Sequence, residues 1–362
     1  MIPRSLFPLR RLRRGALLVF PLAFAPAARA QWSIQNPATL ASFRGMSIVD
    51  SSVVWISGTK GMFSWTADAG HRWHTGQVTG AESFDFRAVH AISLDTALLM
   101  VSSQDTALIY RTTDRGQSWA LQYRDASKGA FLDAIAFFDS NRGLTVGDPV
   151  NGRFVVLETK DGGQHWARIP DLGLPPSLPG EGAFAASGTA LITCGTNDAW
   201  FGSGGGATSR VFHSSDGGRS WSVSNTPIQA AAAPAGIFSL ACAGRRHLIA
   251  VGGNYAKPDP ATVTVALSDD AGATWIASRP APTTAFLSGV AYLETAHAQR
   301  LIAVGTDGTA LSLDGGRTWT RQDTLSLNVV MAGSNGRAWA AGAHGSVAAL
   351  NPPHPSANVT AP

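Results

Sequence analysis

Three charged residues are the strongest candidates for chemistry in this sequence. Arg44 and Arg87 each stand second in a short apolar segment, after Phe43 and Phe86, and Asp133 follows Phe131 and Leu132 at the start of another. Two guanidinium groups near a carboxylate can pair with it or hold an anion between them. They can act together only if the segments that carry them lie side by side.

Other chemistry finds little support in the residue patterns. The chain has no Gly-Lys-Ser phosphate loop, no dinucleotide-binding fingerprint before a helix and no nucleophile elbow. His71 and His74 could offer two metal ligands, but no third ligand lies nearby in the sequence. The sequence therefore predicts no metal, no cofactor and no catalytic residue, and it leaves open whether the protein is an enzyme.

Six copies of one pattern organise the chain. Each reads Ser or Thr, any residue, Asp, any residue, Gly, any two residues and Trp, and successive aspartates are 44 to 55 residues apart, a period typical of propeller repeats. Such a carboxylate can accept backbone N–H bonds at the head of a turn, and the glycine can close that turn. Six equivalent turns around a ring cannot converge on one substrate, so a structural role is predicted for Asp68, Asp114, Asp161, Asp216, Asp270, Asp314, Trp73, Trp119, Trp166, Trp221, Trp275 and Trp319.

The segments between these patterns predict strands. They are short apolar runs rich in Val, Ile and Phe, bounded by Gly, Asp and Asn. Each repeat supplies three strands before its pattern and one after it, which is a four-stranded propeller blade. In the fourth repeat the first two strands are predicted at 182–188 and 190–195. The seventh repeat has three strands, and the strand beginning at Trp32 is predicted to complete it and close the ring.

The predicted fold class is therefore all-β, a seven-bladed β-propeller over residues 31–351. The repeated pattern resembles the Asp-box, or BNR, repeat of sialidase-type propellers. Its spacing and its Asp-Gly-Gly-x-x-Trp form most resemble the photosystem II stability/assembly factor family. This resemblance implies a non-catalytic part in building a membrane protein complex, with another protein as partner. Basic residues contribute to partner contact in that family, and Arg44 and Arg87 are the candidates here.

Two alternatives stay open beside protein binding. A sialidase-type glycoside hydrolase needs an arginine trio, a tyrosine nucleophile backed by glutamate, and an acid/base aspartate. Phe43-Arg44 and Phe86-Arg87 begin like the Phe-Arg-Ile-Pro motif of such enzymes but lack Ile-Pro, and no tyrosine has a recognisable glutamate partner. Non-catalytic glycan binding is the other alternative, with Trp200, Phe201 and Tyr255 as stacking platforms.

Strand direction places the predicted binding residues on one face of the ring. The Asp-boxes lie on one face, called the box face. The starts of the inner strands and the turns between second and third strands lie on the other, called the loop face. Enlarged loops at 197–209 and 254–262, with 170–182, are predicted to form its rim. The predicted binding residues of this face are Arg44, Arg87, Asp133, Lys60, Asp148, Asn254, Tyr255, Asp307 and His344.

Residues 1–30 are predicted to be a signal peptide, with an N-terminal membrane anchor as the alternative. Arginines precede an apolar run at 16–27, and a small-residue cleavage site ends at Ala30. The leader carries six arginines and no acid, so its removal changes the net charge from +4 to 4 − 6 = −2. Nucleic acid is therefore not expected as a partner. The mature protein is expected in the periplasm or outside the cell, with no membrane span and with a disordered tail at 352–362.

The two cysteines, Cys194 and Cys242, lie in apolar runs of neighbouring repeats. In an exported protein they could form a disulfide, and buried free thiols are the alternative.

Overall fold

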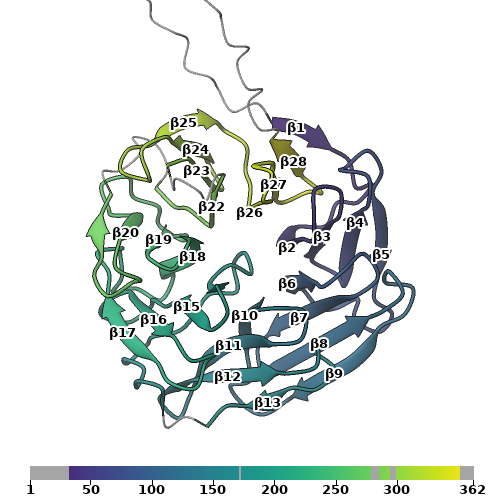
Figure 1. Ribbon diagram of the computed structural model, residues 1–362, viewed down its shortest axis with the longest axis horizontal. Helices are drawn as coiled ribbons and strands as arrows, with labels where there is room; N and C mark the ends of the chain where they lie inside the picture. Colours follow the sequence, from purple (N-terminus) through teal and green to yellow (C-terminus); the bar gives the residue numbers. More distant parts are fainter. Residues whose placement is uncertain (1–31, 171–172, 279–284, 294–298, 351–362) are drawn as a thin grey trace, which may run out of the picture.

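The chain forms a ring of antiparallel sheets. The computed structural model describes residues 32–170, 173–278, 285–293 and 299–350. Within these ranges there are seven four-stranded sheets and no α-helix. The sheets stand around a common axis as the blades of a propeller (Figure 1). The predicted all-β, seven-bladed fold is confirmed, whereas the predicted signal peptide and tail lie outside the described residues.

In the first six blades the innermost strand comes first in the sequence and the outermost comes last. Blades 1 to 3 consist of β2 (Phe43–Ile48), β3 (Val54–Gly58), β4 (Met62–Thr66), β5 (His74–Gln77); β6 (Phe86–Ala91), β7 (Ala97–Ser103), β8 (Thr106–Thr112), β9 (Ala120–Asp125); and β10 (Leu132–Phe137), β11 (Gly143–Val150), β12 (Arg153–Thr159), β13 (Ala167–Arg168). Blades 4 to 6 consist of β14 (Leu191–Cys194), β15 (Asp198–Gly202), β16 (Arg210–Ser214), β17 (Ser222–Asn225); β18 (Ala235–Ala243), β19 (His247–Asn254), β20 (Val265–Ser268), β21 (Ile276–Ala277); and β22 (Gly289–Tyr292), β23 (Leu301–Gly305), β24 (Gly308–Ser312), β25 (Thr320–Asp323).

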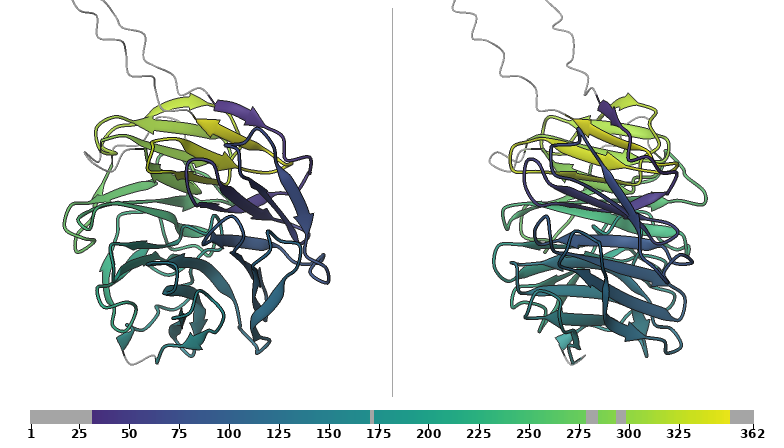
Figure 2. Two further views of the ribbon diagram at one scale, coloured as in Figure 1. Left: turned by 45° about the vertical axis from the view of Figure 1, so that its right-hand side comes forward. Right: turned by 90° about the vertical axis from the view of Figure 1, so that its right-hand side faces the viewer.

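The two ends of the described chain meet in blade 7. This blade contains β26 (Val329–Ala332), β27 (Ala338–Ala341) and β28 (Val347–Leu350), and its outer strand is β1 (Trp32–Gln35). β1 pairs antiparallel with β28, with Trp32 opposite Leu350 and Gln35 opposite Val347. The two strands lie side by side in every view (Figures 1 and 2). The predicted closure of the ring by the N-terminal strand is confirmed.

One strand assignment in blade 4 is wrong. Residues 182–188 were expected to be its first strand, but they form a loop, and the first two strands are β14 and β15. The apolar residues of this loop are covered by other blades: Ala186 and Phe184 pack against Phe238, in β18, and against Phe286. An apolar run buried by such contacts resembles, in sequence, one buried by strand pairing.

The Asp-boxes form one hydrogen-bonded turn that is repeated six times between the third and fourth strands. In each box the Ser or Thr hydroxyl accepts the glycine N–H at 2.8 to 2.9 Å. The aspartate Oδ1 accepts the N–H of the residue four positions later at 2.8 to 3.0 Å. The residue after the aspartate donates its N–H to the first hairpin of the same blade, as Arg115 does to Asp95. The box turns and first hairpins therefore share the box face.

The box glycine presses each turn against the preceding blade. Gly316 has a φ of +85°. A Cβ at this position would lie 2.8 Å from the Leu267 side chain of blade 5. The other five box glycines also have positive φ and also abut a side chain of the preceding blade. Glycine is needed here both for the turn and for close contact between blades.

The box tryptophans fill the interfaces between blades. Trp119 of blade 2 packs on Phe63 and Trp55 of blade 1, and Trp319 of blade 6 packs among Ile249 and Leu267 of blade 5. The other four box tryptophans pack in the same way into clusters shared with the preceding blade. Trp32 completes the series by packing between blades 6 and 7, where its Nε1 donates to Thr309 Oγ1 at 3.5 Å. Every blade interface thus holds one such tryptophan.

No helix among the described residues is long and apolar enough to cross a bilayer.

Replacement of a box tryptophan should destabilise the ring. Trp319 is only 5% exposed, so Trp319→Ala is expected to lower the free energy of unfolding by about 3–5 kcal/mol through lost burial and the cavity left behind. Urea unfolding followed by circular dichroism measures this change. Leu313→Ala is the control, because Leu313 lies in the same box but is 63% exposed. Equal stability of the two variants would contradict the role given to Trp319.

The box aspartates should make the fold sensitive to acid. Hydrogen bonds to the carboxylates lower the pKa of Asp114, Asp161 and Asp270 to about 2. A lowered pKa in the folded state stabilises the protein above the unfolded pKa, near 4, and this contribution is lost as the pH falls toward 2. The wild type should therefore be more stable than the triple Asp→Asn variant at pH 5, and the difference in urea midpoint should shrink between pH 4 and 2. A difference independent of pH would argue against this linkage.

Candidate binding site at the channel mouth

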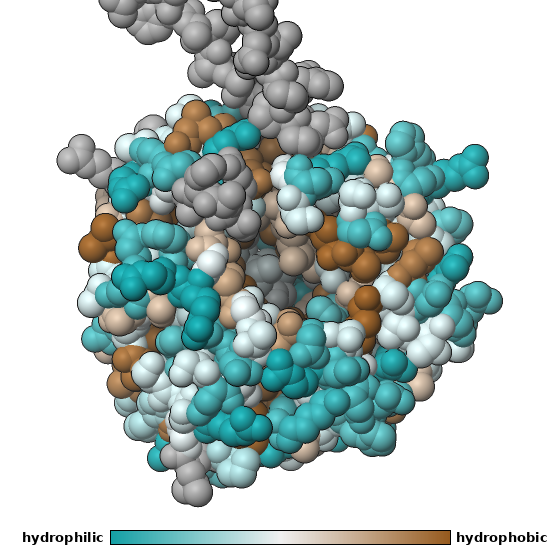
Figure 3. All heavy atoms as spheres, viewed as in Figure 1, coloured by the Kyte–Doolittle hydropathy of each residue, from teal (hydrophilic) through white to brown (hydrophobic). Residues whose placement is uncertain are grey.

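A cavity of about 670 Å³ opens at the loop-face end of the ring axis. It is lined by the starts of inner strands from several blades, by the loop 182–188 and by Tyr255. Figure 3 shows the molecule hollowed at the centre of the ring. Arg44, Arg87 and Asp133 all line this cavity, so the structure brings together the three residues that the sequence singled out.

A β-bulge places each of these side chains. The pairing of β2 with β3 skips Arg44, the pairing of β6 with β7 skips Arg87, and the pairing of β10 with β11 skips Asp133. The same shift in blade 5 skips Phe238. A bulge leaves one residue out of the ladder and redirects its side chain. Here the same bulge in four blades presents side chains of three kinds, two arginines, an aspartate and a phenylalanine, to one cavity.

Arg44 and Arg87 form the basic side of the cavity. Arg44 Nη1 donates to Ala186 O at 3.5 Å, and Arg87 Nη1 donates to Ala185 O at 3.2 Å. Burial lowers the pKa of Arg44, and the charge of Arg87 lowers it further. The carboxylate nearest to Arg87, that of Asp85, is 3.9 Å away and partly exposed. Because this carboxylate neutralises their positive charge only weakly, the two half-buried guanidinium groups favour an anionic ligand.

Asp133 lines the same cavity and forms no ion pair with the residues that the structure describes. Its side chain is fully buried, and neither carboxylate oxygen has a hydrogen-bond partner among the described residues. Burial raises the pKa of Asp133 well above its usual value, and the nearby Asp148 adds to this effect. Arg87 and the Ala185 N–H lower it, but neither meets the carboxylate in hydrogen-bonding geometry. Burial also raises the pKa of Asp148, whose Oδ1 accepts the Ala183 N–H at 3.1 Å.

Four aromatic residues form the apolar side of the cavity. Phe184 stacks on Phe238 with ring centroids 4.1 Å apart, and Phe286 meets Phe238 edge to face at 4.9 Å. Tyr255 meets Phe238 edge to face at 6.0 Å and is 57% exposed. Of these four, the sequence had indicated only Tyr255. An alignment of the inner strands would have found Phe238, which stands at the position of Arg44 and Arg87.

Asp148 also lines the cavity, but four other predicted binding residues do not. Lys60, Asp307 and His344 are exposed in turns of the loop face. They are absent from the described residues that line the cavity. Asn254 is buried, and its Oδ1 accepts the N–H groups of Ala256 and Lys257. Its role is to shape the loop that presents Tyr255.

The predicted rim requires a second correction. Trp200 and Phe201 lie within β15 and are fully buried, so they cannot stack on a glycan. Asn197 lies on the box face, where its carbonyl accepts the N–H of Gly217 in a box turn. Both errors follow from the misplaced first strand of blade 4. Glu181 of the rim is buried, where its carboxylate accepts Arg210 Nε at 2.8 Å and Ser203 Oγ at 2.6 Å.

Comparisons with known proteins bear on the fold. No protein-family model matches the chain, and no curated protein matches its sequence. Among solved structures, "YCF48 bound to D1 peptide" is similar with a TM-score of 0.64 and 15% identity, over 89% of this chain and 97% of that chain. YCF48 from Cyanidioschyzon merolae is similar with a TM-score of 0.62 and 16% identity, over 89% of this chain and 99% of that chain. "Structure of U3-55K" gives 0.61 and 14%, over 91% and 100%.

The chain shares the fold of YCF48. YCF48 is a photosystem II assembly factor, so the resemblance stated from the Asp-boxes is confirmed as a similarity of structure. At this level of identity the comparison establishes the propeller fold, and the function has to be argued from the cavity.

Removal of the buried charge at Asp133 should stabilise the free protein. Asp133→Asn keeps the shape of the side chain and removes the carboxylate, so the variant should be more stable near pH 7 by about 1 kcal/mol or more. A raised pKa in the folded state means that the wild type is penalised above the unfolded pKa. The advantage of the variant should therefore shrink as the pH falls toward 4. Urea unfolding between pH 4 and 8 tests this, with the exposed Asp307→Asn as control. A variant less stable than the wild type at pH 7 would contradict it.

Proposed function

We propose that this protein is an exported, non-catalytic β-propeller that binds a segment of another protein at its channel mouth and serves in the assembly of an envelope or membrane complex. The single observation that carries this proposal is the cavity, which sets half-buried arginines opposite an aromatic cluster. Export rests on the leader-like sequence of residues 1–30, and the assembly role on likeness to YCF48.

The two sides of the cavity fit the chemistry of a peptide. Arg44 and Arg87 suit an acidic side chain or a terminal carboxylate, because a guanidinium can donate two parallel hydrogen bonds to it. Phe184, Phe238, Phe286 and Tyr255 suit an apolar side chain, since aromatic rings bury large areas in defined geometries. A short segment with an apolar residue beside a carboxylate would use both sides at once. One of the similar structures, that of YCF48, holds a peptide of D1.

A rigid ring favours this function. The cavity is built on strand ends whose backbones are fixed by antiparallel ladders, and the bulges set the direction of the side chains. Because the site is already formed, little conformational entropy of its side chains and loops is lost when a ligand binds. The loop 182–188 is the main irregular element of the wall, and the two arginines and Ser187 anchor it.

The hydrolase alternative lacks support in the cavity. Tyr255 is the tyrosine among the described lining residues, and those residues include no glutamate to activate it. Two glutamates near the loop face have other partners. Glu181 accepts a hydrogen bond from Arg210, and Glu82 accepts the Gly80 N–H at 2.9 Å. Glycan binding keeps Tyr255 as a platform, but its two other predicted platforms are buried.

Peptide selection tests the proposed function. The probe is a library of linear peptides of random sequence with free carboxyl termini, selected against the chain from residue 31 onward. We expect binders that combine a carboxylate with an apolar residue. In fluorescence anisotropy the best binder should lose at least about tenfold in affinity on Arg44→Ala plus Arg87→Ala, and it should weaken with rising salt.

Lys60→Ala is the matched control, because Lys60 is a cation on the same face but outside the cavity. It should leave the affinity unchanged. Equal binding by the double arginine variant would place the peptide elsewhere on the ring, and failure to select any binder would remove peptide binding as the function.

A further inference from the structure

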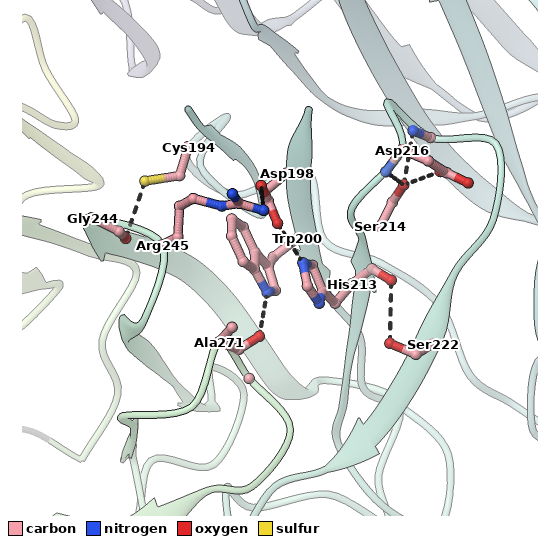
Figure 4. Close-up of polar contacts among 12 residues, drawn as sticks. Cys194, Asp198, Trp200, His213, Ser214, Asp216, Ser222, Gly244, Arg245 and Ala271 are labelled. Atoms are coloured by element: carbon pink, nitrogen blue, oxygen red, sulfur yellow. Dashed lines mark hydrogen bonds and ion pairs between the residues drawn. The ribbon is translucent and has the colours of Figure 1, made fainter. Parts of the chain in front are cut away.

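The two cysteines meet across the interface between blades 4 and 5. Cys194 ends β14, and Cys242 lies near the end of β18, so both inner strands bring their sulfur atoms to the box face. Cys194 Sγ donates to Gly244 O of blade 5 at 3.2 Å (Figure 4), and Cys242 Sγ lies 3.8 Å from Thr193 O of blade 4. Each thiol thus contacts the backbone of the other's blade, so both side chains lie at the same point of the interface.

Contacts that do not involve sulfur hold these two blades in register. The carboxylate of Asp198 in blade 4 accepts Arg245 Nη2 of blade 5 at 2.7 Å and His213 Nε2 at 3.0 Å. Trp200 Nε1 of blade 4 donates to Ala271 O of blade 5 at 2.9 Å. Figure 4 shows these contacts beside Cys194. The positions of the two thiols are therefore fixed by the surrounding structure before any bond joins them.

No strand pairing joins the two blades at this point. β14 and β18 belong to different sheets, so their contact rests on side chains and isolated polar bonds. A covalent bond here would add a link of a kind that the described residues provide nowhere else, since both cysteines are free in the structure.

We propose that Cys194 and Cys242 are a built-in oxidation site, which a disulfide oxidant converts to an inter-blade disulfide that fastens blades 4 and 5. The bond would close a loop of the chain from residue 194 to residue 242, which restricts the unfolded state. It lies on the box face, opposite the channel mouth, so it stabilises the ring without occupying the cavity. This inference does not rest on the proposed function.

The chemistry is an ordinary exchange with a low-molecular-weight disulfide such as oxidised glutathione. Cys194 loses its proton and attacks one glutathione sulfur, which forms a mixed disulfide and releases one glutathione thiolate. Cys242 then loses its proton and attacks the sulfur of Cys194, which forms the Cys194–Cys242 bond and releases the second glutathione thiolate. The two protein thiols are oxidised, the glutathione disulfide is reduced, and two protons pass to the two thiolates.

The surroundings favour Cys194 as the attacking thiol. The neighbouring Cys242 thiol lowers the pKa of Cys194, and the charge of Arg245 acts in the same direction. The neighbouring Cys194 thiol and burial raise the pKa of Cys242. The attacking group is thus the thiol that ionises more readily, and its contact with Gly244 lies at an exposed position.

Oxidation of the folded protein tests the proposal. The chain from residue 31 onward is incubated with oxidised glutathione, digested without reduction and analysed by mass spectrometry. We expect a peptide pair joined through Cys194 and Cys242, the loss of both free thiols, and a monomer on a non-reducing gel. The oxidised protein should unfold at a higher urea concentration than the reduced protein.

The single variants separate the roles of the two thiols. Cys242→Ser should stop at a mixed disulfide on Cys194, and Cys194→Ser should react more slowly at Cys242. The double serine variant should show no difference in urea midpoint between oxidising and reducing conditions, which controls for other effects of the oxidant. Retention of both thiols in the wild type, or mixed and intermolecular disulfides in place of the internal bond, would overturn the proposal.

Discussion

The packing of one tryptophan into every interface between neighbouring blades is the interaction on which this structure depends. Blades make no strand ladder with each other, so side-chain packing and a few backbone hydrogen bonds hold the ring together. The Asp-box fixes a turn on each blade, its glycine lets that turn abut the preceding blade, and its tryptophan enters the shared core. Blade 7 has no box, and Trp32 of β1 performs the same packing between blades 6 and 7. Closure of the ring therefore repeats, with a strand from the other end of the chain, the contact used at the other six interfaces.

The backbone of the inner strands is the same in several blades, but the side chains that it presents at the channel mouth differ. The bulge at the start of the inner strand recurs in blades 1, 2, 3 and 5, yet it presents Arg44, Arg87, Asp133 and Phe238. The backbone geometry that directs a side chain into the channel mouth is thus separate from the chemistry of that side chain. A basic side and an aromatic side arise at one cavity because blades with different residues at the same position face each other across the ring axis. This separation explains how propellers with very similar folds can have unrelated ligands.

The aspartates of the boxes and those of the channel mouth have opposite electrostatics. Those of the boxes accept hydrogen bonds from hydroxyl and backbone groups, which lowers the pKa of Asp114, Asp161 and Asp270. Asp133 and Asp148 at the channel mouth are desolvated, which raises their pKa, and Asp133 has no hydrogen-bond partner among the described residues. The first group serves the stability of the fold. The second group costs stability, as is usual where a site is arranged for a ligand.

The sequence by itself determined the blade count, the strands of the regular repeats, the role of Trp32 and the presence of Arg44, Arg87 and Asp133 at the channel mouth. These features follow from the local pattern of apolar and polar residues, from the residue types of the turns and from the repeat period, all of which can be read from the sequence. Only the tertiary structure decided that 182–188 is a loop, that Trp200 and Phe201 are buried, that Phe184, Phe238 and Phe286 join Tyr255, and that Cys194 and Cys242 lie at one blade interface. Each of these depends on which residues of different blades or loops come into contact, and such long-range packing leaves no periodic signal in the sequence.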